Sequence, residues 1–493
     1  MTTRLSKSRF QKGLQCEKAL WLAVHRRELA DPITESTQWI FDQGTEVGQL
    51  AHGLFPDGIE VTEDHLHSSQ ALSTTEGLLA DGARTLYEPA FRFDGVLVRV
   101  DILVPIRDGR WDLYEVKSSS TLKPEHITDA AVQTYVVEGA GLSVRRSCIV
   151  HLDTSYVWEG GAYDLARLFA VEDVTRDVRA FMPGIPALLK RFRATLKGPE
   201  PHVRIGAQCK KPYPCDFLGY CHASLAGAHP ITDLPRLSEG ALHSLLDMGV
   251  TSICDVPEGF AGLSPVQQEV VRVVKAGVSE IDVAGLEGAL ANLTWPVYHL
   301  DFETVMPALP IWPYTHPYQL IPFQYSVHVH HEDGSYEHRE YLHTAPDDPR
   351  PALTRQLIGD LDATGSIMHY TPYERRCLRE LAAAVPERAA DISALRDRLV
   401  DLEPIVRRNT LHPATNGRTS IKAVLPAWFP ELSYDDLAIS DGTAASTQYL
   451  RSLRELRPPL ETAALYDDLR EYCKMDTLAM VKLLEILREQ VAE

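Results

Sequence analysis

The chain has 493 residues, of which 44% are hydrophobic and 24% are charged. This length exceeds what one hydrophobic core organises, so we expect two or three domains, and the composition excludes a mainly disordered or fibrous protein. No segment reaches the roughly 18 uncharged apolar residues of a membrane span. The basic N-terminus also lacks the apolar run of a signal peptide, so we expect a soluble, cytoplasmic protein.

The charge balance is strongly acidic, with 49 Lys and Arg against 68 Asp and Glu and a net charge of −19. Such a balance argues against nucleic acid as a partner, because phosphate binding needs cationic surface. A metal-dependent enzyme, however, collects carboxylates at its active sites, and a local basic channel can lie on an acidic body. Net charge therefore does not decide the partner.

The first 200 residues have a mixed α/β pattern, with helical spacing in some segments and period-two alternation in others. In chain order, the expected elements are a helix at 39–55, a hairpin at 85–104 interrupted by Gly95, a turn at Asp108-Gly109, a strand at 111–117, a helix at 124–139 and a buried strand at 147–152.

Two of these segments carry a first group of candidate catalytic residues. Asp101 falls in one expected strand, and Glu115 and Lys117 occupy positions i and i+2 of the next, so their side chains share a face. A hairpin brings Asp101 close to both. Paired carboxylates suit a hard divalent cation that activates a bound water, and Lys117 can orient that water or stabilise the transition state. The alternative is an exposed hairpin with ordinary surface charges.

Two flanking patterns extend this group. Gly48-x3-His52 lies on the upstream helix and Gln133-x-Tyr135 on the downstream helix. Together with the strand residues, and in this order, they resemble the RecB-type branch of the PD-(D/E)XK nucleases. The resemblance implies catalysis by the strand residues, a metal- or phosphate-binding role for His52, and substrate positioning by Gln133 and Tyr135. The alternative for His52 is an ordinary surface position on its helix.

A second group consists of cysteines. Cys209, Cys215 and Cys221 occur in the Pro-rich segment CKKPYPCDFLGYC, with five residues in each gap. Three thiols so close together in an intracellular chain indicate a metal site rather than disulfides. The best candidate for a fourth ligand is Cys16, near the other end of the same region.

One N-terminal cysteine with a C-terminal trio resembles the iron–sulfur site of the CRISPR-associated RecB-type exonucleases, which implies a structural 4Fe-4S cluster. Those families usually have a shorter Cys-x2-Cys gap before the last cysteine, whereas both gaps here hold five residues. Zn²⁺ held by four thiolates is therefore the alternative, and redox sensing is an alternative role for the site. The other cysteines are expected in the core: Cys148, Cys254, Cys377 and Cys473.

Residues 231–283 contain short helical patterns separated by Gly and Pro. They resemble helix-hairpin-helix pieces, which contact nucleic-acid backbones, and a plain structural linker is the alternative. A new α/β pattern begins at Pro296 with the strand 297–304, followed by a hairpin turning at Asp333-Gly334. Helices follow to the end, where 466–487 has a clear 3.6-residue stripe.

This second half carries a third group of acids. Asp301 and Glu303 share a face at a strand end, and Tyr472 and Asp476 share a face of the late helix. Asp-x-Glu on a first strand with Tyr-x3-Asp on a late helix resembles the DEDDy 3′–5′ exonucleases of the ribonuclease H-like superfamily. Both motifs are also common by chance, but their order and separation favour the resemblance.

The same resemblance requires a further acid between the two motifs. Glu374 is the candidate, a Glu where those enzymes carry Asp, and Asp401 is the fallback. The resemblance implies that Asp301, Glu303, Glu374 and Asp476 hold two divalent ions, Mg²⁺ or Mn²⁺, and that Tyr472 orients the attacking water. Lys422 and His412 could contact phosphates, although solvated loop positions are the commoner outcome.

Over nearly its whole length the chain resembles bacterial fusion proteins that join both nuclease types. We expect a PD-(D/E)XK restriction-endonuclease-like domain at 1–224, a helical connector at 225–292 and a ribonuclease H-like domain at 293–493. The expected function is metal-dependent hydrolysis of DNA, single-stranded or at duplex ends, in repair, recombination or defence. The alternatives are an exoribonuclease, or a nucleic-acid-binding or redox-sensing protein with one degenerate centre.

Overall fold

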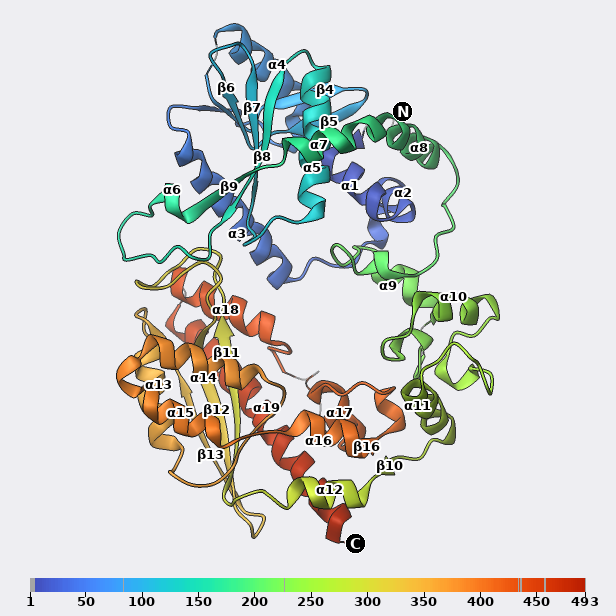
Figure 1. The fold of residues 1–493 in the computed structure, drawn as a ribbon, viewed down its shortest axis with the longest axis vertical. Coiled ribbons are helices and arrows are strands. Elements are labelled where there is room, and N and C mark those ends of the chain that lie inside the picture. The colour runs from blue at the N-terminus through green and yellow to red at the C-terminus, as the bar shows by residue number, and fades with distance from the viewer. Residues whose placement is uncertain are drawn as a thin grey trace. The chain divides into compact units, whose positions relative to one another are not determined.

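The computed structural model describes residues 5–82, 84–225, 227–432, 434, 437–455 and 458–492. The fold is mixed α/β with several mixed sheets, as the sequence predicts (Figure 1). The chain divides into two compact units. The first is Met1–Ala223 with Pro307–Tyr318, and the second is Ser224–Met306 with Gln319–Glu493. Residues 225–292 are thus counted with the second unit, and a short later segment with the first.

The first unit is built on a six-stranded mixed sheet. Its order is β2 (Ile59–Glu60), β3 (Leu86–Tyr87), β6 (Ile102–Pro105), β7 (Trp111–Lys117), β8 (Val144–Leu152) and β9 (Phe169–Asp173). Strands β6 and β7 are antiparallel, whereas β7 and β8 are parallel. The strand predicted at 111–117 and the turn at Asp108-Gly109 are therefore confirmed, and Gly109 adopts the positive φ of 81° that this turn requires.

The predicted hairpin at 85–104 is more elaborate than its alternation indicates. It forms four short strands, of which β3 and β6 belong to the large sheet, while β4 (Ala90–Phe93) and β5 (Val96–Arg99) pair in a separate sheet with β1 (Leu5–Ser6). The chain changes sheet at the bend that contains Asp101. Asp101 consequently lies immediately before a strand rather than within one.

Helices cover the first unit's sheets and close its core. They are α1 (Lys7–Gln15), α2 (Glu17–His25), α3 (Glu35–Ala51), α4 (Ser68–Ala80), α5 (Pro124–Gly139), α6 (Leu165–Leu168), α7 (Thr175–Phe181), α8 (Ile185–Lys197) and α9 (Leu218–His222). Helix α5, which has the predicted bounds, packs along β8 (Figure 1). Its residues Val132 and Val136 belong to one buried core with Leu113 of β7 and Ile149 of β8.

The second unit is built on a five-stranded sheet. Its order is β13 (Tyr336–Leu342), β12 (Ile321–His330), β11 (Val297–Val305), β14 (Ile367–His369) and β15 (Leu399–Asp401). Strand β12 is antiparallel to both neighbours, whereas β14 runs parallel to β11 and to β15. The pairing of β11 with β12 shifts register between Glu303 and Thr304, an irregularity that can re-aim a side chain.

The two faces of this sheet are covered by different helices. On one face, Leu300 and Phe302 pack with residues of α13 (Pro349–Asp360), α14 (Tyr373–Ala384) and α15 (Ala389–Asp397). On the other face lies the long helix α19 (Pro459–Ala492) (Figure 1). The remaining elements are α10 (Glu239–Asp247), α11 (Pro265–Ala276), β10 (Glu280–Ile281), α12 (Val283–Leu290), α16 (Leu402–Asn409), β16 (Thr410–Leu411), α17 (Ile421–Trp428) and α18 (Gly442–Arg454). Among the described helices, none combines the length and apolar character that crossing a bilayer requires.

Candidate active sites

The acids and lysine of the first group meet at the centre of the six-stranded sheet. The amide of Val116 donates to Asp101 Oδ2 at 2.6 Å, which fixes the bend against β7. Glu115 and Lys117 share a face of β7, as predicted, with Lys117 Nζ 2.6 Å from Glu115 Oε1. Glu115 is buried, with 1% of its surface exposed.

The pKa values of Asp101 and Glu115 are shifted in opposite directions. Burial and the neighbouring Glu115 raise the pKa of Asp101 well above its ordinary value. Burial acts in the same direction on Glu115, but the ammonium groups of Lys117 and Lys7 outweigh it and hold the pKa of Glu115 well below its usual range. One carboxylate is therefore held ionised while its neighbour resists ionisation without a cation.

A cavity of about 850 Å³ opens beside these residues, and Asp101, Glu115, Lys117 and His52 all line it. His52 follows helix α3 and stacks on Tyr87, with ring centroids 4.1 Å apart. Burial lowers the pKa of His52 and favours the neutral imidazole, the form that binds a metal. The structure thus brings His52 to the same cavity as the predicted catalytic residues.

The two predicted substrate-positioning residues are separated. Gln133 Nε2 donates to Glu115 Oε2 at 2.5 Å, so Gln133 belongs to the group. Tyr135 instead donates to Asp94 Oδ2 at 3.1 Å and packs against Phe93. Residues two apart on a helix point to nearly opposite sides, which is why the structure does not bring Tyr135 to the carboxylates.

Three residues that sequence reasoning missed complete this first centre. Lys7 Nζ lies 2.7 Å from Glu115 Oε1 and 3.6 Å from Asp129 Oδ2, and Asp129 also pairs with Lys117. Glu88 lines the cavity near Arg99, whose Nε donates to Glu88 Oε2 at 3.2 Å. Only Asp129 had a usable signal, because it precedes Gln133 by four residues on the predicted helix and so shares its face.

The four predicted cysteine ligands also come together. Cys16, Cys209, Cys215 and Cys221 all line one small cavity of about 20 Å³, and all four are free thiols. Gln15, the last residue of helix α1, hydrogen-bonds the segment that carries Cys209 and Cys215. Its Nε2 donates to the carbonyls of Gln208 at 2.8 Å and Tyr213 at 2.7 Å.

The donor set of this cavity fits a metal or cluster. Burial raises the pKa of Cys215 to about 11, so without a cation its thiol stays protonated at neutral pH. A bound metal reverses that preference, because thiolate is the ligand form. Of the other cysteines, Cys148, Cys377 and Cys473 are buried as expected, whereas Cys254 is exposed, because its 3-10 turn directs only Ile253 into the core.

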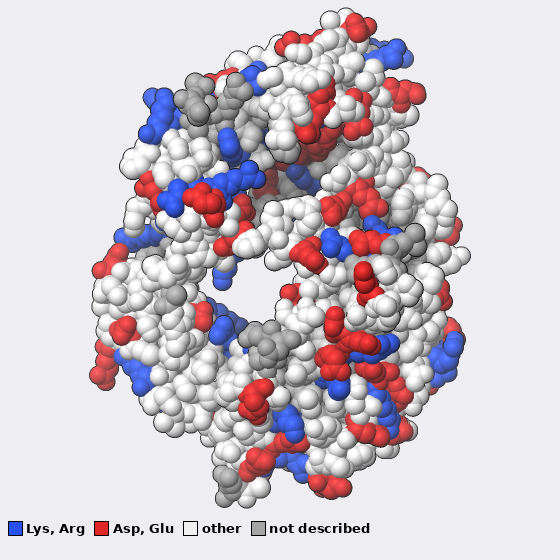
Figure 2. Space-filling view, turned by 180° about the vertical axis from the view of Figure 1, so that it is seen from behind, with Lys and Arg blue, Asp and Glu red and all other residues white. Residues whose placement is uncertain are grey.

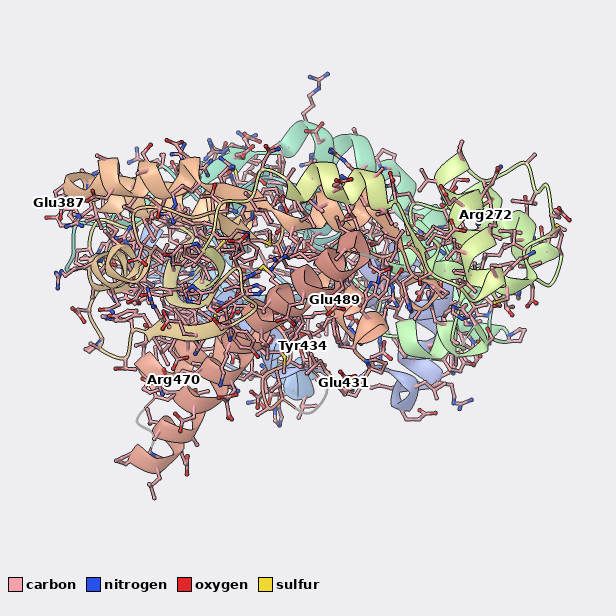
Figure 3. The ribbon with its side chains drawn as sticks, turned by 90° about the horizontal axis from the view of Figure 1, so that it is seen from below. Arg272, Glu387, Glu431, Tyr434, Arg470 and Glu489 are labelled. Carbon is pink, nitrogen blue, oxygen red and sulfur yellow. The ribbon has the colours of Figure 1, made fainter. Side chains whose placement is uncertain are left out.

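The third group converges between β11 and the two helices that flank it. Asp301 and Glu303 project from β11, Asp476 from α19, and Glu374 from the first turn of α14. Glu374 is 2% exposed and hydrogen-bonds Asp301. Tyr434 donates to Asp476 Oδ1 at 2.6 Å, and Figure 3 shows Tyr434 beside α19.

Burial disfavours the ionised forms of the carboxylates of this second centre. Burial raises the pKa of Glu374 to about 8 and that of Asp476 to about 6. Burial and neighbouring acids raise the pKa values of Asp301 and Glu303 well above their ordinary range. Glu374 Oε2 is also buried without a hydrogen-bond partner. A divalent cation would satisfy these acids, so the donor set fits the metal that the sequence predicts.

The fallback acid, Asp401, has another role. Its Oδ1 accepts from the amides of Glu403 at 3.1 Å and Thr371 at 3.0 Å and so caps helix α16. Glu374, which contacts Asp301 directly, is therefore the better placed of the two candidates.

Lys422 contacts the second centre although the residue as a whole is exposed. Its Nζ donates to the hydroxyl of Tyr472 at 3.0 Å and lies 5.1 Å from the ring centroid of Tyr434. Burial raises the pKa of both Glu303 and Asp476, and the charge of Lys422 offsets part of that rise. His412, in contrast, packs against Trp428 and receives the amide of Ala414.

Comparison with known proteins adds one finding. Residues 298–420 match a family described as a domain of unknown function, DUF2779. The matched segment includes Asp301, Glu303 and Glu374 and ends before Tyr472 and Asp476. No curated protein matches the chain.

Proposed function

We propose that this protein is a divalent-metal-dependent nuclease that hydrolyses phosphodiester bonds of DNA at two centres, one in each unit. The observation that carries the proposal is the convergence of Asp301, Glu303, Glu374 and Asp476 from three elements into one cluster, in which all but the half-buried Asp301 are buried. Four carboxylates that cannot all ionise alone favour divalent cations, and a paired metal site is suited to phosphodiester hydrolysis.

The strand order of the second unit supports the ribonuclease H-like resemblance. The acids lie on β11, the central strand, and face α19, which carries Asp476. Bound divalent ions would activate water and stabilise charge on the leaving oxygen. Tyr472, held by Lys422, is suited to orient the attacking water, and Lys422 is suited to bind a substrate phosphate.

The geometry of the first unit supports the PD-(D/E)XK-like proposal in the same way. Asp101, Glu115 and His52 would hold the metal, and Lys117 would stabilise the developing charge. The shared cavity of about 850 Å³ leaves room for a nucleotide beside them.

The four cysteines support a structural iron–sulfur cluster, with Zn²⁺ as the alternative. Metal analysis of anaerobically purified protein, together with its visible absorption spectrum, separates the two, because only the cluster absorbs there. Iron with acid-labile sulfide supports the cluster, and stoichiometric zinc without visible absorption supports the alternative.

The nuclease proposal is tested by Asp101→Asn and Asp301→Asn, assayed separately on 5′- and 3′-labelled single- and double-stranded DNA with Mg²⁺ or Mn²⁺. Each substitution should remove the products of one centre, and Asp301→Asn should stop 3′ trimming. The matched controls are substitutions of two exposed acids, Glu76→Gln in the first unit and Glu387→Gln in the second. Glu387 lies at the edge of the view in Figure 3. RNA of the same sequence is run in parallel, and faster cleavage of RNA would overturn the assignment of DNA as substrate.

A further inference from the structure

One buried thiol faces the second centre rather than the apolar core. Cys473 lies on α19 next to Tyr472, and its Sγ is 3.6 Å from Asp301 Oδ2. An oxygen of Asp301, an oxygen of Glu303 and this sulfur all lie within 4.8 Å of one another. Among the described residues, no other group of three or more His, Cys, Asp or Glu side chains has its ligand atoms this close together.

Packing alone does not account for this placement. Cys377, another buried cysteine of the same unit, packs with the apolar residues of α13, α14 and α15. Cys473 instead approaches a carboxylate and, at 4.0 Å, the backbone carbonyl of Asp301. A thiol is a weak hydrogen-bond donor, so it adds little to a cluster of acids as long as it keeps its proton.

A second observation indicates that a cation belongs beside this thiol. Glu374 hydrogen-bonds Asp301, is 2% exposed, and has a buried Oε2 without a hydrogen-bond partner. The nearest imidazole nitrogen, His369 Nδ1, is 3.3 Å away but is engaged with the carbonyl of Thr371. A buried acceptor without a donor is costly unless a cation satisfies it.

We propose that Cys473 supplies a thiolate ligand, together with Asp301 and Glu303, to a divalent transition-metal ion of the Mn²⁺ to Zn²⁺ series. Carboxylates alone suit Mg²⁺ and Mn²⁺ similarly, whereas sulfur favours softer ions and is a poor ligand for Mg²⁺. On binding, the thiol proton is released to solvent. This inference rests on the proposed function, because it names the metal of the same centre.

The test is a titration of the full-length protein, with its cysteine cluster loaded, using Co²⁺ as the probe. Wild type is compared with Cys473→Ser, and Cys377→Ser is the matched control for loss of a buried thiol. The wild-type minus Cys473→Ser difference spectrum should show a thiolate-to-cobalt charge-transfer band, while the four-cysteine site and the first centre cancel. Cys473→Ser should bind Co²⁺ at least about tenfold more weakly, with Mg²⁺ binding little changed.

A featureless difference spectrum with equal Co²⁺ affinities would overturn the thiolate ligand. A band lost equally in Cys377→Ser would also overturn it, because the effect would then come from repacking. Cys473→Ala, with a thermal unfolding curve, guards against misfolding of the serine variant. Asp301→Asn keeps the two proposals distinguishable: if it stops 3′ trimming while Cys473→Ser leaves metal preference unchanged, the nuclease proposal stands and the thiolate ligand falls. If Asp301→Asn changes neither cleavage nor metal binding, the proposed function itself fails.

Discussion

Single carboxyl groups set the pH behaviour of the second centre. Burial raises the pKa of Glu374 to about 8 and that of Asp476 to about 6, whereas carboxyl groups of an unfolded chain have a pKa of about 4. Between these values the folded protein binds more protons than the unfolded chain. The free energy of unfolding of the metal-free protein must therefore fall as the pH rises through this interval.

We expect this fall in chemical unfolding experiments from about pH 5 to about pH 8.5 with a chelator present. Glu374→Gln cannot ionise at this position, so it should flatten the curve and be more stable than wild type at the alkaline end. Saturating Mn²⁺ should reverse the trend in wild type, because metal binds the ionised carboxylates. A wild-type stability that is constant or increases over this interval would show that burial does not disfavour the ionised forms of these acids.

Lys7 has a role in the first centre that a substitution can test. It lies on the same oxygen of Glu115 as Lys117 does and helps to hold that carboxylate ionised. These variants are compared in an Asp301→Asn background, in which only the first centre is expected to be active. There, Lys7→Met should reduce cleavage by about 10- to 100-fold, and Lys7→Arg should restore part of it. The exposed Lys190→Met on α8 serves as the control. Equal rates for Lys7→Met and Lys190→Met would mean that Lys7 only packs.

At the scale of elements, the sequence predicts local structure better than the assembly of sheets. The bounds of β7 and α5 match because alternation and helical spacing are local properties of those segments. The transfer of the chain between two sheets around Asp101 was missed, because the same alternation serves either sheet. Lys7 was missed for a related reason: it meets Glu115 across 108 positions, a contact that no spacing rule encodes. Lys422 was named only as a candidate phosphate contact, because no spacing rule connects it with Tyr472, which its ammonium reaches in the structure.

The segment Pro307–Tyr318 is the least predictable element, because it belongs to the first unit although it follows β11 of the second. Ala308 donates its amide to Gln43 Oε1 at 2.9 Å, and the Tyr318 hydroxyl donates to the carbonyl of Ser118 at 2.5 Å. Leu309, 4% exposed, packs in the core that contains Val47. This segment therefore completes the first unit.

Leu309→Ala should lower the free energy of unfolding of the first unit by about 2–5 kcal/mol, because it removes buried methyl groups and leaves a cavity. Tyr314→Ala in the same segment should have little effect, because Tyr314 is 72% exposed. Denaturant unfolding measures both. For the same reason, a fragment ending at Ala223 should be less stable than the first unit in the whole chain. A stable fragment, or equal effects of the two substitutions, would contradict this assignment.

At the scale of the whole molecule, the structure explains part of the formal net charge of −19. Several acids are buried at the two centres, where they count in the formal charge but add little charge to the surface. On the face shown in Figure 2, basic and acidic side chains are interspersed rather than separated into single-sign patches. The nucleic-acid binding that we propose would depend on local cations such as Lys117 and Lys422, and it should weaken with increasing salt.

We propose that the carboxylates of both units hold metal ions that cleave phosphodiester bonds. The most direct test of this proposal is the rate at which end-labelled DNA is cleaved by the purified protein with Mn²⁺, with chelator, and after substitution of Asp101 and Asp301 together. We expect cleavage by the wild type only with metal, partial loss in each single variant, and no cleavage by a folded double variant. Undiminished cleavage by the double variant, or no metal-dependent cleavage of DNA by the wild type, would contradict it.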